Sequence, residues 1–342
     1  MDICQSDPVT RFAHPRAFAG FIDSCGIAAG PWLASHALPT LHDDPGELIP
    51  VLKAWSLFDC LAAQSGLTQL GWLVGQSAGS AAMEPNLAVM LQNVPTPFYG
   101  LQRILRHTRS KESSHISQGV LLRAQEVVYF THYGGLKAAP GYHHSQNYQL
   151  RVYMSLFRSL FGSDWLPSQI GIESHCVPHG LDEMLPGVEI LSGQPCGYIV
   201  IPKALLARPV ALHAEQARSA YLDSQSGYVK SLRTILESSL PYGYVSQEEV
   251  AEEMGSSVRT VTRRLSDYGL TYGMLIDALR FERARAALDS AEVRLIDVAA
   301  LAGVEDQGDF TRLFKRISGL TPSEYRYFLH EGDCTEFRGQ FT

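Results

Sequence analysis

The sequence predicts an α+β domain followed by an all-α domain, in which two tandem helix–turn–helix units are joined by a linker helix. Two observations support the second half of this prediction. Apolar residues recur there at helical spacing between Gly and Pro stops, and the whole pattern occurs twice. The first half mixes helical patterns with a β-rich run, VLLRAQEVVYFTHY. We therefore expect a first domain over residues 1–222, a polar linker at 223–228 and a second domain over 229–342.

The more complete helix–turn–helix pattern covers about residues 294–318. Gly303 follows a short amphipathic helix, at a point where a left-handed residue is needed and glycine adopts that conformation at least cost. Asp306 can cap the next helix through its side chain. That helix has one apolar face at the spacing i, i+3, i+4 and i+7, formed by Phe310, Leu313, Phe314 and Ile317. After Gly319, the sequence Thr-Pro-Ser-Glu predicts a capping box that starts a further helix.

The same pattern occurs earlier in the chain. Residues 250–255 match residues 298–303 at an offset of 48 positions, and residues 261–265 match residues 310–314 at an offset of 49. The difference of one residue falls in the turn, where an insertion is tolerated. A first helix–turn–helix is therefore expected over about residues 246–268, and two units in tandem are a stronger signal than one.

The outward faces of the two second helices are the candidate nucleic-acid contacts. Their residues are Arg259, Thr262, Arg263, Gln307, Asp309, Thr311, Arg312, Lys315 and Arg316. Net charge is −7, so the chain as a whole does not favour DNA, but a local basic stripe is enough for contact in a groove. Arg263 and Arg312 occupy matched positions, and an arginine can donate two hydrogen bonds to the major-groove edge of guanine.

Residues 271–289 predict the linker helix between the two units. Thr271 can cap it, and its Ala and Arg content favours a helical interior. At 1.5 Å per residue it would be roughly 27 Å long. Successive major grooves on one face of B-DNA are about 34 Å apart. Because the two second helices extend beyond the ends of the linker helix, one chain is expected to place Arg263 and Arg312 in adjacent grooves.

These residues resemble the AraC/XylS family of bacterial transcription regulators over roughly residues 229–329. The resemblance rests on Gly303, Asp306, the run Phe-Thr-Arg-Leu-Phe-Lys at 310–315, and Gly-Leu-Thr-Pro-Ser-Glu-Tyr-Arg at 319–326. Two positions depart from the family pattern. Val304 stands where Phe is usual and Gly308 where Ser is common, and both changes could weaken the second helix–turn–helix or alter its base preference.

The resemblance implies a cytoplasmic regulator, either activator or repressor, that is not an enzyme and needs no cofactor. Its expected partners are double-stranded promoter DNA and a small-molecule effector, with RNA polymerase and a second copy of the chain as further candidates. The chain has no apolar window of 18 or more residues, so no membrane partner is expected. The N-terminus has no secretory signal pattern, and the six scattered cysteines indicate reduced thiols.

The first half more loosely resembles the arabinose-binding-type sensor domain of AraC regulators, over about residues 20–205. The features that suggest it are residues 70–75, a helix at 99–106 and the Asp-Trp-Leu-Pro sequence at 164–167. This resemblance implies a ligand-receiving and dimerising domain without naming the ligand. The expected helices cover about residues 16–25, 48–64, 98–109 and 147–161, and the expected strands lie in 119–133, 169–176 and 187–201.

Three residues are candidate ligand contacts in this half. Arg123 interrupts an apolar strand pattern, and its guanidinium could bind a carboxylate or phosphate, although strict alternation would turn it toward solvent. His143 and His144 form a pair that could serve either a ligand or packing.

Two interpretations of the chain as an enzyme are alternatives to the regulator hypothesis. Gly75-Gln76-Ser77-Ala78-Gly79 fits the nucleophile elbow of a serine hydrolase, with Ser77 as nucleophile, but that motif needs a strand before it and a βαβ context that is missing here. His175 and His179 could begin a site for a metal-dependent enzyme, but no second ligand pair of fixed spacing follows. We therefore expect no catalytic residue and no metal site.

Overall fold

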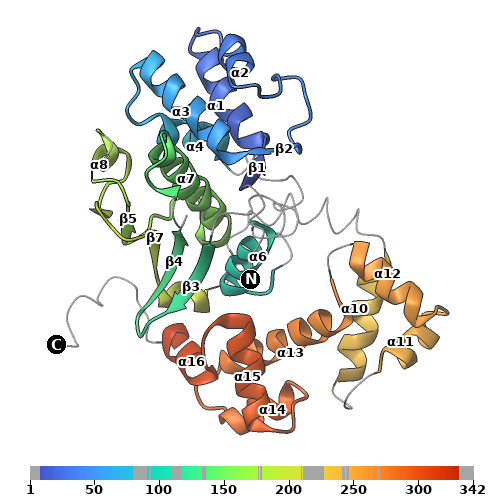
Figure 1. Cartoon of the computed structure of the whole chain (residues 1–342). Helices are drawn as coiled ribbons and strands as arrows, with labels where there is room; N and C mark the ends of the chain where they lie inside the picture. The colour runs from blue at the N-terminus through green and yellow to red at the C-terminus, as the bar shows by residue number, and fades with distance from the viewer. Residues whose placement is uncertain are drawn as a thin grey trace, which may run out of the picture. The chain divides into compact units, whose positions relative to one another are not determined.

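The chain folds as two compact units (Figure 1). Unit 1 comprises residues 1–88 and 101–202, and unit 2 comprises residues 89–100 and 203–342. This computed structural model describes residues 8–79, 91, 94–108, 117–132, 136–175, 177, 179–208, 210, 227–240, 243, 246–267 and 270–330. All but the last two residues of the expected linker at 223–228 lie outside the described residues, so the domain boundary stays a prediction.

Unit 1 is α+β, as expected. Its helices are α1 (Ala13–Ser24), α2 (Gly30–Ser35), α3 (Val51–Ser65), α4 (Leu70–Ala78), α6 (Pro97–His107, of which 97–100 fall in unit 2), α7 (Tyr142–Phe161) and α8 (Leu181–Met184). Its strands are β1 (Val9–Arg11), β2 (Leu48–Pro50), β3 (Ser117–Leu122), β4 (Glu126–His132), β5 (Gln169–Gly171), β6 (Glu189–Leu191) and β7 (Gly197–Pro202). The helices and strands expected from the sequence are all found, with ends that differ by a few residues.

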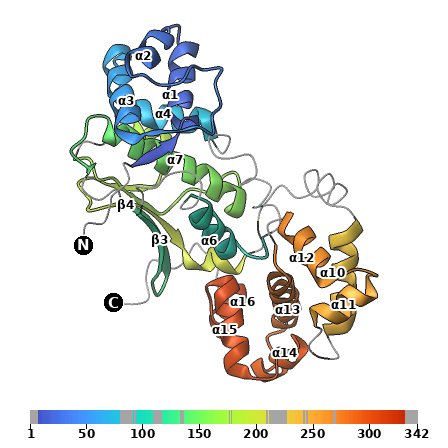
Figure 2. The ribbon, with the colours of Figure 1, turned by 45° about the vertical axis from the view of Figure 1, so that its right-hand side comes forward.

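The main sheet of unit 1 has the order β3-β4-β7-β5-β6. Strands β5 and β6 run parallel, and the other neighbouring pairs are antiparallel, with β7 as the central strand. Figure 2 shows β3 and β4 side by side. The β-rich run of the sequence forms the hairpin β3–β4, in which Val120 pairs with Tyr129. A separate two-stranded sheet joins β1 to β2.

Helix α7 is the central packing element of unit 1, where it lies against α3, α4 and β7. It begins at Tyr142, five residues before the expected start, because Gly141 takes a left-handed conformation (φ 74°) as its N-cap. A Cβ on Gly141 would lie 1.9 Å from the carbonyl oxygen of Trp55, so only glycine fits. On α4, a Cβ on Gly71 would lie 2.0 Å from the carbonyl oxygen of His144. The two helices can therefore approach closely only at glycine.

The described part of unit 2 is helical. It contains η4, a 3₁₀ helix (Lys203–Ala207), followed by α10 (Gly227–Ser239), α11 (Gln247–Glu253), α12 (Val258–Asp267), α13 (Tyr272–Leu288), α14 (Leu295–Leu301), α15 (Gln307–Ser318) and α16 (Pro322–His330). The pairs α11–α12 and α14–α15 are the two expected helix–turn–helix units, and α13 is the expected linker helix. The predicted caps are present: Thr271 accepts from the amide of Met274, and Asp306 accepts from the amide of Asp309.

Two apolar cores share helix α13. The first core joins its N-terminal half to α10, α11 and α12, and its buried members include Leu232, Leu236, Val250, Val261, Leu265, Leu275 and Leu279. The second core is aromatic and joins the C-terminal half of α13 to α15 and α16, through Phe281, Phe310, Phe314 and Tyr325. Because one helix fills both cores, the two helix–turn–helix units are held by a single rigid element.

Candidate nucleic-acid interface and ligand cavity

Helix α12 presents a basic outer face. Val261 and Leu265 are fully buried in the first core, which turns Arg259 and Arg263 outward as exposed side chains. Among the described residues, no carboxylate lies within ion-pairing distance of either arginine. Both guanidinium groups can therefore be offered to an anionic partner or to base edges without breaking an ion pair to any described residue.

Two neighbouring side chains on α12 are held by contacts with α10 and α11. The Thr262 hydroxyl accepts a hydrogen bond of 2.9 Å from the Gln247 amide on α11. The Arg264 guanidinium lies over the Tyr228 ring, 4.3 Å from its centroid, which ties α12 to α10. The outer face of α12 is thus positioned by contacts in which Arg259 and Arg263 take no part.

Helix α15 carries the corresponding face of the second helix–turn–helix, but its arginines are paired with carboxylates of the protein. Arg312 forms an ion pair with Asp309 one turn earlier, and its Nη2 lies 4.0 Å from Oδ1 of the cap residue Asp306. Arg316 pairs with Asp277 on α13 at 2.5 Å. Lys315 is exposed and has no ion-pair partner among the described residues. The two second helices therefore differ in how much positive charge they offer.

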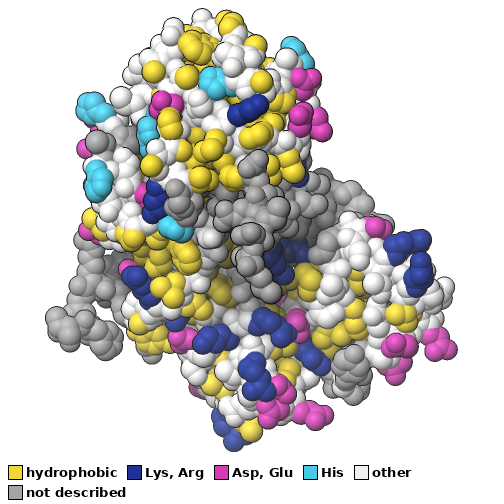
Figure 3. All heavy atoms as spheres, viewed as in Figure 1, with side chains coloured by type: hydrophobic (Ala, Val, Ile, Leu, Met, Phe, Trp, Pro, Cys, Tyr) yellow, Lys and Arg dark blue, Asp and Glu magenta, His cyan; other side chains and the backbone are white. Residues whose placement is uncertain are grey.

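The remaining predicted contacts on α15 lie at its first turns. Gln307 is exposed, and its carbonyl oxygen accepts the Thr311 hydroxyl at 2.9 Å. Lys and Arg side chains are visible over the helices of unit 2 in the space-filling view, with acidic side chains beside them (Figure 3). This mixture agrees with the net charge of −7 on the whole chain.

The end of α15 and the following helix α16 contact two segments that precede α10 in the chain. The Thr96 hydroxyl donates to the carbonyl oxygen of Ile317. Gly319 caps α15 with φ 74°, and a Cβ there would lie 2.8 Å from the Phe98 ring. Helix η4 packs against α16. Unit 2 is therefore built from two stretches of the chain that are distant in sequence, residues 89–100 and 203–342.

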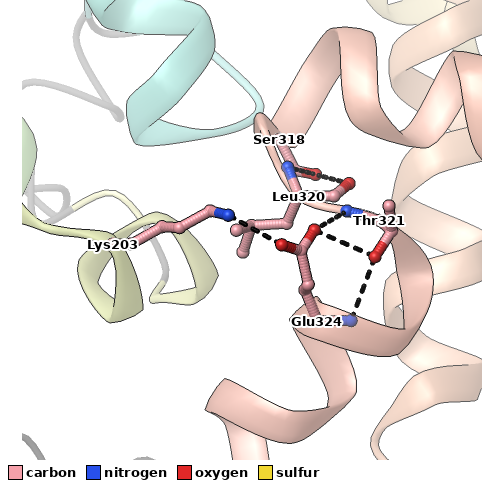
Figure 4. Close-up of polar contacts among 5 residues, drawn as sticks. All are labelled: Lys203, Ser318, Leu320, Thr321 and Glu324. Carbon is pink, nitrogen blue, oxygen red and sulfur yellow. Dashed lines mark hydrogen bonds and ion pairs between the residues drawn. The ribbon is translucent and has the colours of Figure 1, made fainter. Parts of the chain in front are cut away.

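An ion pair joins η4 to α16 (Figure 4). Lys203, the residue that follows β7, has a side chain that is 7% exposed, and its Nζ donates to Oε1 of Glu324 at 2.7 Å. The other carboxylate oxygen of Glu324 accepts from the amide (2.8 Å) and hydroxyl (2.9 Å) of Thr321, which completes the capping box of α16. Burial would raise the pKa of Glu324, but the bonds from Lys203 and Thr321 outweigh it and leave the pKa lowered.

Unit 1 contains a cavity of about 770 Å³ near the N-terminus of α7. Its walls come from the turn between α3 and α4, the loop before α7, the first turns of α7, the loop after β5 and the turn between β6 and β7. The lining residues are Thr68, Lys137, Ala139, Tyr142, His143, Asn147, Glu173, Ser174, His175, Val177, His179, Gly193 and Gln194. Nine of these thirteen residues carry polar or charged side chains, so a small molecule in this cavity would meet many hydrogen-bonding groups.

A family model described as the arabinose-binding domain of AraC transcription regulators matches residues 26–210, more than half of the chain. The chain belongs to the AraC family of transcription regulators. A second model, described as a helix-turn-helix domain, matches residues 250–327. The two matches confirm the family resemblance of both halves.

Curated AraC-type relatives match part of the chain. It is 33% identical over 150 residues to the ornithine utilization regulator of Pseudomonas aeruginosa, covering 41% of this chain and 44% of that one. It is 32% identical over 144 residues to the transcriptional regulator VirS of Mycobacterium tuberculosis, covering 39% and 41%. The match thus spans less than half the length of these relatives. The crystal structure of the regulator CdpR from Pseudomonas aeruginosa covers 86% of this chain and 95% of its own, at 20% identity and a TM-score of 0.40.

The serine-hydrolase reading of this AraC-family chain is wrong. The Gly-x-Ser-x-Gly sequence lies on helix α4 and its C-cap, so Ser77 sits within a helix and not on a strand-to-helix turn. The run Leu-Gly-Trp-Leu-Val, which would have to be the preceding strand, is the first part of the same helix. Without the sharp turn, the hydroxyl of Ser77 is not presented as a nucleophile elbow presents it.

The metal-enzyme reading has no structural support either. His175 and His179 both line the cavity, but no group of three His, Cys, Asp or Glu side chains in the described ranges could hold a metal ion. None of the described helices has the length and apolar character needed to cross a bilayer.

The structure separates the three ligand candidates. Arg123 lies in the turn after β3, not within a strand, with its side chain 59% exposed and 3.9 Å from the Glu126 carboxylate. His144 is buried against α4 and is not a lining residue. His143 does line the cavity. Of the three, only His143 is placed where a ligand in this cavity could touch it.

Both histidines are held neutral by their surroundings. Burial lowers the pKa of His144 to about 3, and the neighbouring His143 adds to the effect. Burial also lowers the pKa of His143, although the Asp59 carboxylate acts in the opposite direction. At neutral pH, His143 therefore offers the cavity an uncharged imidazole.

Sequence reasoning missed the polar residues that converge on the cavity, above all Lys137, Asn147 and Glu173. Each stands in a different segment, and none belongs to a motif. It also missed Lys203, whose partner is 121 positions away. A contact of that kind leaves no signal in spacing or periodicity.

Proposed function

We propose that this protein is a cytoplasmic transcription regulator that binds promoter DNA through α12 and α15 in adjacent major grooves, under the control of a small-molecule effector. The observation that carries the proposal is the paired geometry of unit 2. Two helix–turn–helix units fill two cores on one linker helix, and each turns a basic face of its second helix outward. A helix α13 of 17 residues is about 25 Å long, which suits two contacts one helical turn of DNA apart.

The first helix–turn–helix, α11–α12, is proposed to contribute more to DNA binding than the second, α14–α15. Arg259 and Arg263 form no ion pair with a described carboxylate, whereas Arg312 must break its ion pair with Asp309 before it can contact DNA. The side chains of α15 proposed to contact DNA are Gln307, Thr311, Arg312, Lys315 and Arg316. Asp309, the remaining predicted contact, is proposed to hold the Arg312 side chain until DNA takes its place. Thr262 is proposed to contact the DNA backbone beside Arg263, since hydroxyl groups commonly bind phosphate.

The test is a selection of binding sites from random duplex DNA, followed by affinity measurements on the selected site and on random DNA. Arg263→Ala should cost about 1–3 kcal/mol on the selected site and relax specificity at one base pair. Lys230→Ala is the matched control, because it removes the same charge from an exposed position on α10. Failure of the wild type to prefer any sequence would refute the proposed function.

The cavity of unit 1 is proposed as the effector site. Support comes from its volume, its mixed lining and its place in the segment that matches the arabinose-binding domain model. Contact of His143 with the effector belongs to this proposal. Pairing with a second copy of the chain and contact with RNA polymerase remain predictions from the family resemblance.

A further inference from the structure

One of the residues that line the cavity is a buried carboxylate, Glu173, which hydrogen bonds hold in place. The Glu173 side chain is 4% exposed, and its Oε1 accepts from the backbone amide of Gly197 at 3.3 Å. The backbone amide of Glu173 donates to the fully buried Gln146 side chain at 2.9 Å. A charge removed from water in this way is costly unless a cation stands beside it.

That cation is the ammonium group of Lys137, which also lines the cavity. Lys137 lies in the loop before α7, its side chain is 37% exposed, and its Nζ is 2.7 Å from Oε2 of Glu173. Its ammonium also donates to the carbonyl oxygen of Pro195. Because Lys137 already reaches solvent, its ammonium can leave Glu173 and be hydrated at modest cost. Glu173 has no such freedom.

A second acceptor in the cavity has no donor. Asn147 is 2% exposed and lines the cavity, and its Oδ1 receives no hydrogen bond from the described residues. A buried acceptor left unpaired costs about 1–3 kcal/mol. A ligand that brings an N–H donor to Asn147 would recover that cost on binding.

The charges of the lining decide between classes of ligand. Lys137 is the sole permanent cation among the described lining residues, and Glu173 is the sole carboxylate. An anionic ligand would draw Lys137 away and leave two negative charges in the cavity. A neutral hydroxyl compound would leave the ion pair undisturbed. A ligand cation can replace the lysine ammonium one for one, which keeps the cavity neutral.

We propose that the effector carries a primary ammonium group, which takes the place of the Lys137 ammonium on Glu173 and donates a further hydrogen bond to Asn147. A quaternary ammonium would fail, because it has no N–H to donate. This inference rests on the proposed role of the cavity as the effector site. It makes Lys137 an internal competitor of the ligand.

The test uses the full-length protein and n-propylammonium as probe, with n-propanol, propionate and tetramethylammonium as matched compounds, measured by calorimetry. Removal of the competitor in Lys137→Met should tighten propylammonium binding. If Lys137 occupies Glu173 about nine-tenths of the time, the gain is about tenfold. Propylammonium should also raise the melting temperature of Lys137→Met, since it restores the missing counter-charge.

The double variant Lys137→Met/Glu173→Gln is the control, because it has no buried charge to compensate. It should fold and should not bind propylammonium above the level of n-propanol. Equal or weaker binding of propylammonium by Lys137→Met than by the wild type would overturn the inference, as would binding of n-propanol or propionate as tight as that of the amine. DNA binding measured on the same samples separates the two proposals. Sequence-specific binding without any ammonium binding sinks this inference alone.

Discussion

The ion pair between Lys203 and Glu324 predicts an asymmetry between its two partners. Glu324→Gln keeps the capping box of α16, because Gln can also fill that position, but it leaves a lysine with a 7% exposed side chain without its carboxylate. Breaking a fully buried pair costs about 3–5 kcal/mol, and the 38% exposure of Glu324 reduces this to about 2 kcal/mol. Lys203→Met leaves a carboxylate that keeps its Thr321 bonds and its access to water, so its cost should be at most about 1 kcal/mol.

Urea unfolding of the two single variants and the double variant, each followed by circular dichroism, measures this difference. The double variant should resemble Lys203→Met, because Glu324→Gln is harmful only while the buried ammonium is present. Asp297→Asn is the matched control. It breaks the exposed Arg294–Asp297 pair on α14 and should leave the unfolding midpoint unchanged. Equal costs for the two single variants, or additive costs in the double, would refute the reasoning that Lys203 is the dependent partner.

Three further predictions follow from particular contacts. The pKa of Glu324 is lowered below its ordinary 4.5 in the folded chain. Its contribution to the free energy of unfolding is therefore present above pH 4.5 and is lost as the pH falls through the pKa of the folded state. An acid titration of unfolding should show a component that Glu324→Gln removes. Asp309→Asn should tighten DNA binding several-fold at low salt, since it releases Arg312 and removes a negative charge from the reading helix, and unchanged affinity in a mobility-shift assay would mean that α15 does not approach DNA. Gly71→Ala should destabilise the chain by about 1–3 kcal/mol in thermal unfolding, because its Cβ would lie 2.0 Å from a backbone carbonyl oxygen, and a tolerated substitution would contradict the close approach of α4 and α7.

The features that the sequence predicted well are those that depend on residues close together in the chain. The caps at Thr271 and Asp306, the left-handed stop at Gly303 and the buried face of α15 follow from local spacing, and all are present. The start of α7 was misplaced because it depends on Gly141 meeting a carbonyl oxygen of α3, 86 positions earlier in the chain at Trp55. Such a contact has no local pattern.

The candidate sites divide in the same way. The outward faces of α12 and α15 could be read from helical periodicity, because a helix with one buried face must expose the other. The partners of their arginines could not, since Arg316 meets Asp277 across two helices. The Gly-x-Ser-x-Gly match at Ser77 failed because a motif of small residues is equally compatible with close helix packing. The cavity could not be predicted from the sequence, because its lining residues come from five separate segments of the chain.

The central claim is that α12 and α15 read one duplex in adjacent major grooves, at a spacing fixed by α13. Footprinting and affinity measurements on the selected site, with and without half a helical turn of DNA (about 5 base pairs) inserted between its two sub-sites, test it most directly. The insertion should turn the second sub-site to the opposite face, so affinity should fall toward the non-specific level and the footprint should shrink to one groove. Unchanged affinity, with a single-groove footprint on both the original and the inserted site, would show that only the first helix–turn–helix reads DNA.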